Sequence, residues 1–317
     1  MQLIEAVPNV SAGPDSAAVK HIVYALKHAG GAALLHTDGN PDANRTVFTL
    51  AGTPENTLES LRVLFQIASQ EIDMRVHRGT HPRLGAVDVC PLVPVRNITL
   101  TQTADFARKL AHFAGEELHI PVYLYETNAS SPERKNLAFL RKGEYESLPE
   151  KLKTLPPDFG PQEFSPSVAH TGASVIGARN FLIAFNVSLN TKDTALAKEI
   201  AAVLREKNGG LPGVKAIGWY MENYHCAQVS FNITDYHQTG LAQVFEACKH
   251  EAQQRGIDVT AGELIGLLPR EALQQAGQFY APNLSINEQL QIAAEKMLLN
   301  KIRPFNFNER ILEDRLN

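Results

Sequence analysis

The feature that most constrains the fold is one order of secondary structure that occurs twice along the chain. Hydrophobic periodicity and turn signals in residues 3–95 predict a strand, a helix, two strands, a helix and a strand. Residues 181–269 repeat this order, and the tripeptide NVS occurs in the first strand of each copy, at 9–11 and 186–188. The repetition predicts an α+β protein, an α/β sandwich of two ferredoxin-like βαββαβ subdomains.

The expected elements of both copies follow from periodicity, helix caps and Gly or Pro breaks. In the first copy we expect strands at 3–11, 32–37, 45–52 and 84–95, and helices at 15–30 and 53–72. In the second copy we expect strands at 181–189, 215–223, 226–236 and 259–269, and helices at 193–210 and 239–256. Between the copies we expect a helix at 104–118, a strand at 120–126 and a polar helix at 133–143.

We place the boundary between the subdomains after residue 176, so that 1–176 and 177–317 form the N-terminal and C-terminal subdomains. The two helices of a βαββαβ unit cover one face of its sheet. Two such units therefore predict a ligand groove between them, since ligands favour domain interfaces.

Composition excludes several classes of protein. Lys and Arg number 30 against 34 Asp and Glu, and no basic stripe stands out, so we expect no nucleic-acid partner. No run of 18 apolar residues indicates a membrane span. The N-terminus does not resemble a signal peptide, and the three cysteines form no C-x-x-C pair. These features are typical of a cytoplasmic protein.

Two histidines and two arginines crowd the segment HRGTHPRLG, residues 77–85, just before a long apolar strand. The i, i+4 spacing of the histidines matches zinc-binding helices, but Gly79 and Pro82 argue against a helix, and we expect no metal. A rigid loop is the better interpretation. In it His81 is a candidate general base, since imidazole titrates near neutral pH. The alternative is an ordinary surface histidine.

The segment DGNPDANRT, residues 38–46, partly matches a calcium loop, with oxygen-bearing side chains at alternate positions from Asp38. Its sixth position is Ala43 rather than Gly and strands flank it, so an EF-hand is excluded. We expect a loop between two strands, either a plain hairpin turn or a functional loop. In the second case Asp38 would orient His81 or hold a cationic group of a substrate.

The stretch LPEKLKTLPPDFGPQEFSPSV, residues 148–168, is rich in Pro and precedes the second copy. It is either a linker or the wall of a ligand groove. On pattern alone, a linker is favoured.

Nine segments resemble glutamate formiminotransferases, and together they run nearly from end to end of the chain. The segments are VPNVS (7–11), NRTVFT (44–49), HPRLGAVDVCPLVPVR (81–96), PVYLYE (121–126), GEYESLPEKL (143–152), PDFGP (157–161), GARNFLIAFN (177–186), IGWY (217–220) and LIGLLP (264–269). Bifunctional animal members of the family carry a fused cyclodeaminase domain. This chain resembles the stand-alone transferase.

The resemblance implies transfer of a formimino group from N-formimino-L-glutamate to tetrahydrofolate, a co-substrate, in histidine degradation. The products would be 5-formiminotetrahydrofolate and L-glutamate. The resemblance also implies a homodimer, and it is compatible with a cyclodeaminase partner on a separate chain. The family's catalytic histidine maps to His81 and its assisting aspartate to Asp38.

The folate-binding segment of the family maps onto the Pro-rich stretch, which reverses the linker interpretation there. The mapped residues are Gly160, Pro161, Gln162, Glu163, Phe164, Ser165, Pro166, Ser167, Val168, Ala169, His170, Thr171 and Gly172. The animal pattern, roughly PSWGATV, is shorter and has a Trp that is absent here. The resemblance therefore leaves open which residues of 167–172 contact folate.

Three arginines near the catalytic loop, Arg45, Arg78 and Arg83, are candidates for holding substrate carboxylates, because a guanidinium forms a bidentate fork. Two other functions stay open at this stage. One is a folate-dependent formyl transferase acting on N-formylglutamate or 5-formyltetrahydrofolate. The other is a non-catalytic folate-binding module.

Overall fold

The computed structural model describes residues 1–316 and divides the chain into two compact units, Met1–Asn180 and Phe181–Asn317. Each unit combines helices with a sheet that is wholly or mainly antiparallel, which confirms the α+β class. The predicted division after residue 176 lies within the last strand of the first unit.

The first unit contains a seven-stranded sheet. Its strands are β1 (Leu3–Ala6), β2 (Asn9–Val10), β3 (Ala33–Asn40), β4 (Arg45–Gly52), β5 (Val87–Arg96), β6 (Val122–Leu124) and β7 (Ser174–Ala178). β1 and β2 follow each other along one position in the sheet, between β4 and β5, and both pair with these two strands. β3 pairs with β4. This is the strand order of a ferredoxin-like unit. β7 and β6 extend it beyond β5 in parallel.

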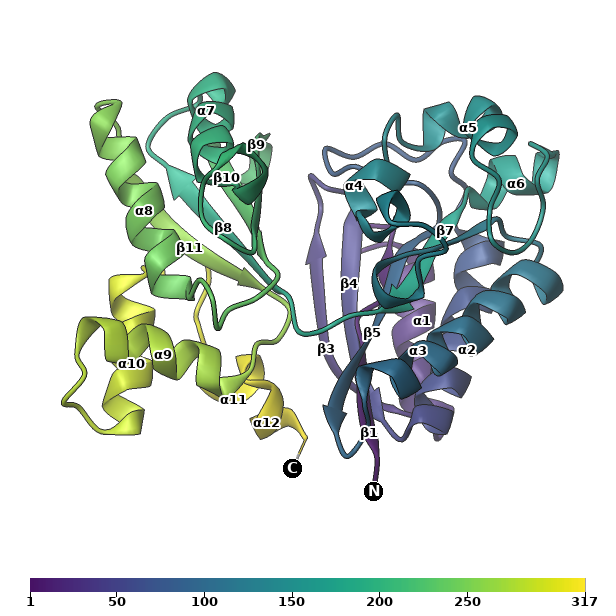
Figure 1. Ribbon diagram of the computed structural model, residues 1–317, viewed down its shortest axis with the longest axis horizontal. Helices are drawn as coiled ribbons and strands as arrows, with labels where there is room; N and C mark the ends of the chain where they lie inside the picture. The colour runs from purple at the N-terminus through teal and green to yellow at the C-terminus, as the bar shows by residue number, and fades with distance from the viewer. Residues whose placement is uncertain (317) are drawn as a thin grey trace. The chain divides into compact units, whose positions relative to one another are not determined.

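The helices of the first unit are α1 (Ala17–His28), α2 (Pro54–Glu71), α3 (Leu100–His112), α4 (Leu137–Leu140), α5 (Leu148–Thr154) and α6 (Pro166–Thr171). A single π-helical turn, Phe113–Glu117, continues α3. Figure 1 shows α1, α2 and α3 side by side along one face of the sheet. Their apolar stripes bury side chains such as Phe48 and Leu50 of β4 in the main core, because alternate strand residues point to the same face.

A second, smaller core forms against β5, β6 and β7. It joins Val89, Tyr123 and Val175 of these strands to Leu140 of α4 and Leu148 of α5. Val89 is absent from the main core, whereas its neighbour Cys90 belongs to it, so these two residues face opposite sides of β5. The segment that carries α4 and α5 therefore packs on the sheet face opposite α1 and α2.

Three expected elements of the first unit differ in detail. The strand predicted at 3–11 is broken between β1 and β2, where Pro8 has no N–H to donate to the ladder. The helix predicted at 133–143 is a 3-10 turn followed by the short α4, because the Asn136 side chain caps a new start by accepting from Ala138 N. The helix predicted at 104–118 starts earlier, at Leu100, where Thr99 and Gln102 form a capping box.

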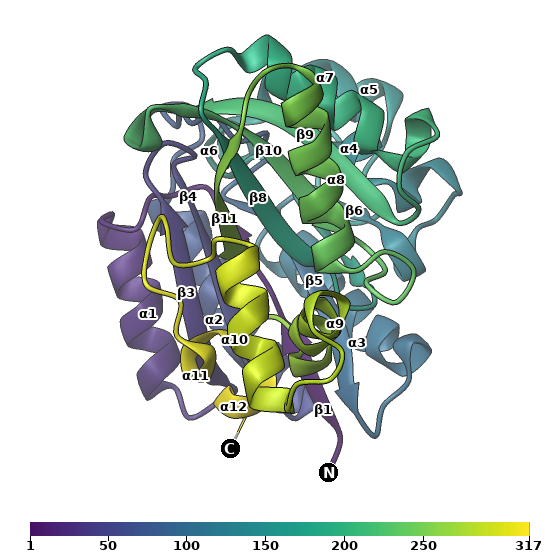
Figure 2. The ribbon, with the colours of Figure 1, turned by 90° about the vertical axis from the view of Figure 1, so that its left-hand side faces the viewer.

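The second unit has the order βαββαβ followed by four more helices. Its elements are β8 (Ile183–Leu189), α7 (Thr194–Leu204), β9 (Val214–Met221), β10 (Cys226–Ile233), α8 (Leu241–Gln254), β11 (Val259–Ile265), α9 (Arg270–Tyr280), α10 (Ile286–Lys296), α11 (Phe307–Arg310) and α12 (Leu312–Arg315). The four strands lie in the order β11-β8-β10-β9, again ferredoxin-like. Figure 2 shows α7 and α8 in front of this sheet. The helix predicted at 193–210 is shorter, because Arg205 turns to extended backbone.

Within residues 1–316 no helix has both the length and the apolar character that a membrane crossing requires.

Candidate active site

A β-bulge in β5 sets the position of Asp88. β5 pairs with β2 through Val89 opposite Asn9 and Val87 opposite Val10, so two steps along β5 match one step along β2. Asp88 is the extra residue. Bulges of this kind redirect a side chain and recur beside active sites. The bulge explains how a carboxylate in an apolar strand can turn to polar partners on the sheet face opposite the main core.

Asp88 is completely buried and receives four hydrogen bonds. Its Oδ1 accepts from Leu84 N at 2.8 Å and from Arg141 Nε at 3.2 Å. Its Oδ2 accepts from Arg45 Nη1 at 2.6 Å and also from Arg141 Nη2. Burial alone would raise the pKa of Asp88, but the charges of Arg141 and Arg45 outweigh it and hold that pKa at about 2. Asp88 is therefore ionised at neutral pH.

Arg45 is fixed from a second side by Asn9. Its Nε and Nη2 both donate to Asn9 Oδ1, at 3.1 and 2.9 Å, and Asn9 Nδ2 donates to Val7 O. Burial lowers the pKa of Arg45 to about 10, so the guanidinium stays charged at neutral pH. Asn9, Arg45 and Asp88 thus join three segments of the family resemblance, VPNVS, NRTVFT and HPRLGAVDVCP, in one buried cluster.

His81 lies half-buried beside this cluster. Its Nδ1 donates to the carbonyl oxygen of Pro82 at 2.7 Å, because a carbonyl can only accept. The lone pair of the neutral ring is consequently on Nε2. Burial lowers the pKa of His81 well below its usual value; the charges of Arg45 and Arg141 lower it further, and that of Asp88 acts in the opposite direction. His81 is thus a neutral imidazole with a defined basic nitrogen.

The loop that carries His81 packs against the β3–β4 turn. Thr80 N donates to Asp42 O at 3.0 Å, and Asn44 Nδ2 donates to Arg78 O at 2.8 Å. A Cβ on Gly79 would lie 2.2 Å from Ala43 O, so only glycine fits this approach. The structure therefore brings together the two polar segments that the sequence singled out, 38–46 and 77–85.

The prediction that Asp38 lies in a loop is wrong. Asp38 is a buried residue of β3, paired with Val47, because the hairpin ladder continues to Asn40 opposite Arg45. The turn is short, since Asn40 Oδ1 accepts from Ala43 N. Cross-strand partners share a sheet face, so Asp38 and Arg45 lie on the same face. A bulge between Leu34 and His36 precedes them, and His36 Nε2 lies 3.7 Å from Asp38 Oδ2.

Arg83 is bound to two glutamates. Its Nη1 donates to Glu144 Oε2 and Glu146 Oε2, both at 2.8 Å, and its Nη2 donates to Glu146 Oε1 at 2.6 Å. The hydrogen bonds to Glu146 are the main reason that the pKa of Arg83 is raised. Its Nε donates to Nδ1 of His77, whose Nε2 donates to Asn44 O. This network links the loop 77–85 to the segment GEYESLPEKL.

Arg78 is the exposed member of the three candidate arginines. Its Nη1 donates to the carbonyl oxygens of His77 at 2.6 Å and Arg75 at 3.4 Å. The three candidate arginines therefore differ in their surroundings. Arg45 lies in a buried ion cluster, Arg78 lies in an exposed loop, and Arg83 is bound by two glutamates.

The predicted folate segment, 160–172, packs directly against residues 84–86, just before β5. Gly172 and Gly85 form a β-bridge, Ala86 N donates to Thr171 O at 2.7 Å, and Tyr145 Oη donates to Ala169 O at 2.6 Å. Gly172 has φ +67°, and a Cβ there would lie 2.4 Å from Leu84 O, so the approach requires glycine.

Most of this segment remains accessible. Gln162, Glu163, Phe164, Pro166 and Ser167 are exposed, and α6 begins where Ser165 accepts from Val168 N. Gly160 has φ +80° and approaches Ile120 O, which fixes the other end of the segment. The two ends are anchored and Val168 is buried, whereas the side chains of 162–164, Pro166 and Ser167 are exposed to solvent.

Sequence reasoning missed Asn9, Asp88 and Arg141. A carboxylate inside the apolar run GAVDVCPLV was a usable signal, because a buried charge requires a partner. No pattern pointed to Arg141, which lies just after the short α4 and reaches Asp88 across 53 positions of the chain.

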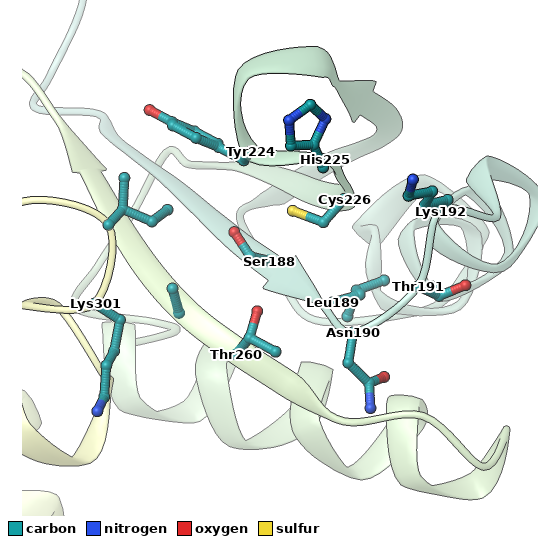
Figure 3. A pocket seen from close by; sticks show the side chains of 12 residues that line it. Ser188, Leu189, Asn190, Thr191, Lys192, Tyr224, His225, Cys226, Thr260 and Lys301 are labelled. Atoms are coloured by element: carbon teal, nitrogen blue, oxygen red, sulfur yellow. The ribbon is translucent and has the colours of Figure 1, made fainter.

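A separate cavity of about 540 Å³ lies in the second unit and contains none of the predicted site residues. Figure 3 shows the thiol of Cys226 and the hydroxyls of Ser188 and Thr260 on its wall. In the part of the chain that the structure describes, no cluster of three or more His, Cys, Asp or Glu side chains could hold a metal ion.

Comparison with known proteins extends this picture over the whole chain. Residues 3–179 match the formiminotransferase domain, N-terminal subdomain, and residues 184–317 match the formiminotransferase domain. Glutamate formimidoyltransferase of Streptococcus pyogenes is 37% identical, with 99% of each chain covered, and that of Thermoplasma acidophilum is 38% identical over 88% of this chain and 92% of that protein.

The rat formimidoyltransferase-cyclodeaminase is 42% identical over 98% of this chain but only 59% of its own length. The chain thus spans about three fifths of the bifunctional relatives. Both halves of the transferase region are present in this chain, which therefore belongs to the formiminotransferase family.

Proposed function

We propose that the protein is a glutamate formimidoyltransferase, which moves a formimino group from N-formimino-L-glutamate to tetrahydrofolate in histidine degradation. The names of relatives that match nearly end to end support this activity. The observation that carries it is the state of His81, a neutral imidazole with its lone pair on Nε2, held beside a buried ion cluster.

In the proposed reaction, the 5-position nitrogen of tetrahydrofolate attacks the formimino carbon and forms a tetrahedral intermediate. His81 Nε2 accepts the proton that this nitrogen loses, and the carbon–nitrogen bond to glutamate then breaks. The imidazolium returns the proton to the departing amino group. A positioned general base of this kind contributes on the order of 10²–10⁴-fold to a rate.

Asp38 is proposed to stabilise the imidazolium or the cationic formimino carbon. Its burial on the sheet face that also carries Arg45 supports a charged role, because a buried carboxylate interacts strongly with a nearby cation. Arg45, Arg78 and Arg83 are proposed to hold substrate carboxylates. Of the three, Arg78 is exposed, whereas Arg45 and Arg83 already have carboxylate partners.

Residues 160–172 are proposed to bind the folate. Two features support this role: the contact of Gly172 with Gly85, just before β5, and exposed side chains that include Phe164. An aromatic ring of this kind could stack on a pterin.

The test is a spectrophotometric assay of the purified protein with tetrahydrofolate and either N-formimino-L-glutamate or N-formylglutamate. The proposal expects turnover with the formimino substrate and a much lower kcat/KM with the formyl compound. The reverse preference would assign a formyl transferase. Folate binding without turnover of either compound would indicate a non-catalytic folate-binding module.

We also propose a cytoplasmic homodimer that cooperates with a separate cyclodeaminase. The resemblance to bifunctional relatives supports the cyclodeaminase, and three free cysteines are compatible with a reducing compartment. Sedimentation equilibrium would test the dimer.

A further inference from the structure

In the cluster around Asp88, two positive charges share one carboxylate as their hydrogen-bond partner. Two guanidiniums, Arg45 and Arg141, surround one carboxylate, and the side chains of these residues are 8%, 13% and 0% exposed. A buried charge without a counterion is unfavourable, because it has lost its hydration. An anion bound at Arg141 would give this guanidinium a carboxylate that it does not share with Arg45.

The hydrogen-bond donors of the cluster show where an anion can bind. Arg45 directs Nη1 to Asp88, and both Nε and Nη2 to Asn9. Arg141 uses Nε and Nη2 on Asp88, but its Nη1 donates to no other group in residues 1–316. A guanidinium so held presents its remaining edge in a fixed direction, which suits a carboxylate.

We propose that Arg141, held by Asp88 beside Arg45, binds the α-carboxylate of the formiminated amino-acid substrate through Nη1. The assignment rests on the proposed function. Asp88 is a positioning residue in this scheme: it fixes the plane of the Arg141 guanidinium and does not touch the substrate.

The chemistry of the two substrates favours this carboxylate over those of the folate. In N-formimino-L-glutamate, one nitrogen and one carbon atom separate the reacting carbon from the α-carboxylate carbon. In tetrahydrofolate, the carboxylates lie at the opposite end of the molecule from the reacting nitrogen. Asp88 Oδ1 accepts from both Arg141 Nε and Leu84 N, and Leu84 lies three positions after His81, so a group that Arg141 holds lies close to the loop of the proposed base.

The experiment compares Arg141→Met and Arg141→Lys with the wild-type protein. Loss of a charged hydrogen bond, worth about 1.5–3 kcal/mol, should raise the KM for N-formimino-L-glutamate by roughly 10–100-fold. The KM for tetrahydrofolate should stay within about twofold. Arg141→Lys keeps the charge but not the fork, so its KM should lie between those of the wild type and Arg141→Met.

Arg134→Lys is a matched control. Arg134 lies seven positions before Arg141, and it also donates to a carboxylate, that of Asp158, at 2.8 Å; both side chains of this pair are 12% exposed. The control should lose similar stability and keep both KM values. If Arg141→Met does not fold, the KM of Arg141→Lys for N-formimino-L-glutamate tests the proposal instead. This variant should fold, because lysine can still pair with Asp88.

Unchanged KM values in both Arg141 variants would overturn the proposal, as would a rise confined to tetrahydrofolate. Calorimetric titration with L-glutamate, the reaction product, separates this proposal from the proposed function, since it needs no turnover. Binding to the wild type and Arg134→Lys but not to Arg141→Met supports the subsite even if the enzyme uses another acyl donor. Equal binding to all three proteins contradicts it.

Discussion

Arg45 and Asp88 lie 43 positions apart in the sequence, and Arg45 Nη1 lies 2.6 Å from Asp88 Oδ2 inside the first unit. The pair depends on a bulge that turns Asp88 out of the main core and on Asn9, which holds the other edge of Arg45. Arg141 completes the cluster. Arg45, Asp88 and Arg141 supply fixed charges that act on the candidate base, and Asn9 holds Arg45 in place, so stability and catalysis should both respond to these four residues.

Asp88→Asn should destabilise the protein by about 3–5 kcal/mol, because it leaves two buried guanidiniums without their counterion. Urea unfolding followed by circular dichroism measures the loss. Asp73→Asn is the control: Asp73 pairs with Arg75 at a more exposed site, 27% and 55% accessible, where solvent screens the ion pair and its loss should change stability little. Equal losses in the two variants would show that the Asp88 cluster is not a structural centre.

The acid limb of kcat/KM should lie below pH 6.5, the usual pKa of histidine. Burial and the charges of Arg45 and Arg141 lower the pKa of His81 and outweigh Asp88, so the ring stays neutral and basic as the pH falls through 6.5. Removing the charge in Arg45→Gln should move that limb to higher pH. A pH–rate series on both proteins checks the direction, and an acid limb above pH 6.5 in the wild type would count against His81.

Gly172→Ala should destabilise the protein and weaken folate binding. Its φ of +67° disfavours a side chain, and a Cβ would meet Leu84 O at 2.4 Å, so the segment 160–172 must move away from Leu84 and Gly85. We expect about 1–3 kcal/mol of backbone strain plus the clash. Gly209→Ala is the control for strain alone, because Gly209 has φ +88° and nothing within 4 Å. Tetrahydrofolate affinity should fall only in Gly172→Ala; a fall in neither variant argues against folate contact there.

Single Lys replacements of Arg45, Arg78 and Arg83 should raise the KM for N-formimino-L-glutamate. We expect the effect on binding alone to be clearest at Arg78, because Arg45 and Arg83 also hold carboxylates of the protein. Steady-state kinetics on the three variants measures it. An unchanged KM in all three would remove these arginines from the substrate site.

The sequence predicted the repeated βαββαβ order well, because periodicity and Gly or Pro breaks are local signals. It placed α2 and β5 almost correctly but made the turn after β3 too long, since the ladder from Asp38 to Val47 depends on pairing between strands. It also expected a regular helix at 133–143, where the side chain of Asn136 starts a new helix instead. Pairing between strands decided the first case, whereas a local side-chain cap, Asn136 Oδ1 accepting from Ala138 N, decided the second.

The site was only partly visible in the sequence. His81 stood out because polar groups crowd one short loop, and resemblance paired it with Asp38. Asp88 could have been found as a charge inside an apolar strand. Arg141 could not have been found in this way. It reaches the cluster only because Leu140 and its neighbours pack on the sheet face opposite α1 and α2.

The most direct measurement of the central claim is the turnover of His81→Ala at saturating tetrahydrofolate and N-formimino-L-glutamate, together with its affinity for tetrahydrofolate. Loss of the general base should lower kcat by about 10²–10⁴-fold. Folate affinity should stay close to that of the wild type, because the imidazole moves a proton and does not anchor the pterin. A kcat within a few-fold of the wild type would contradict the role given to His81.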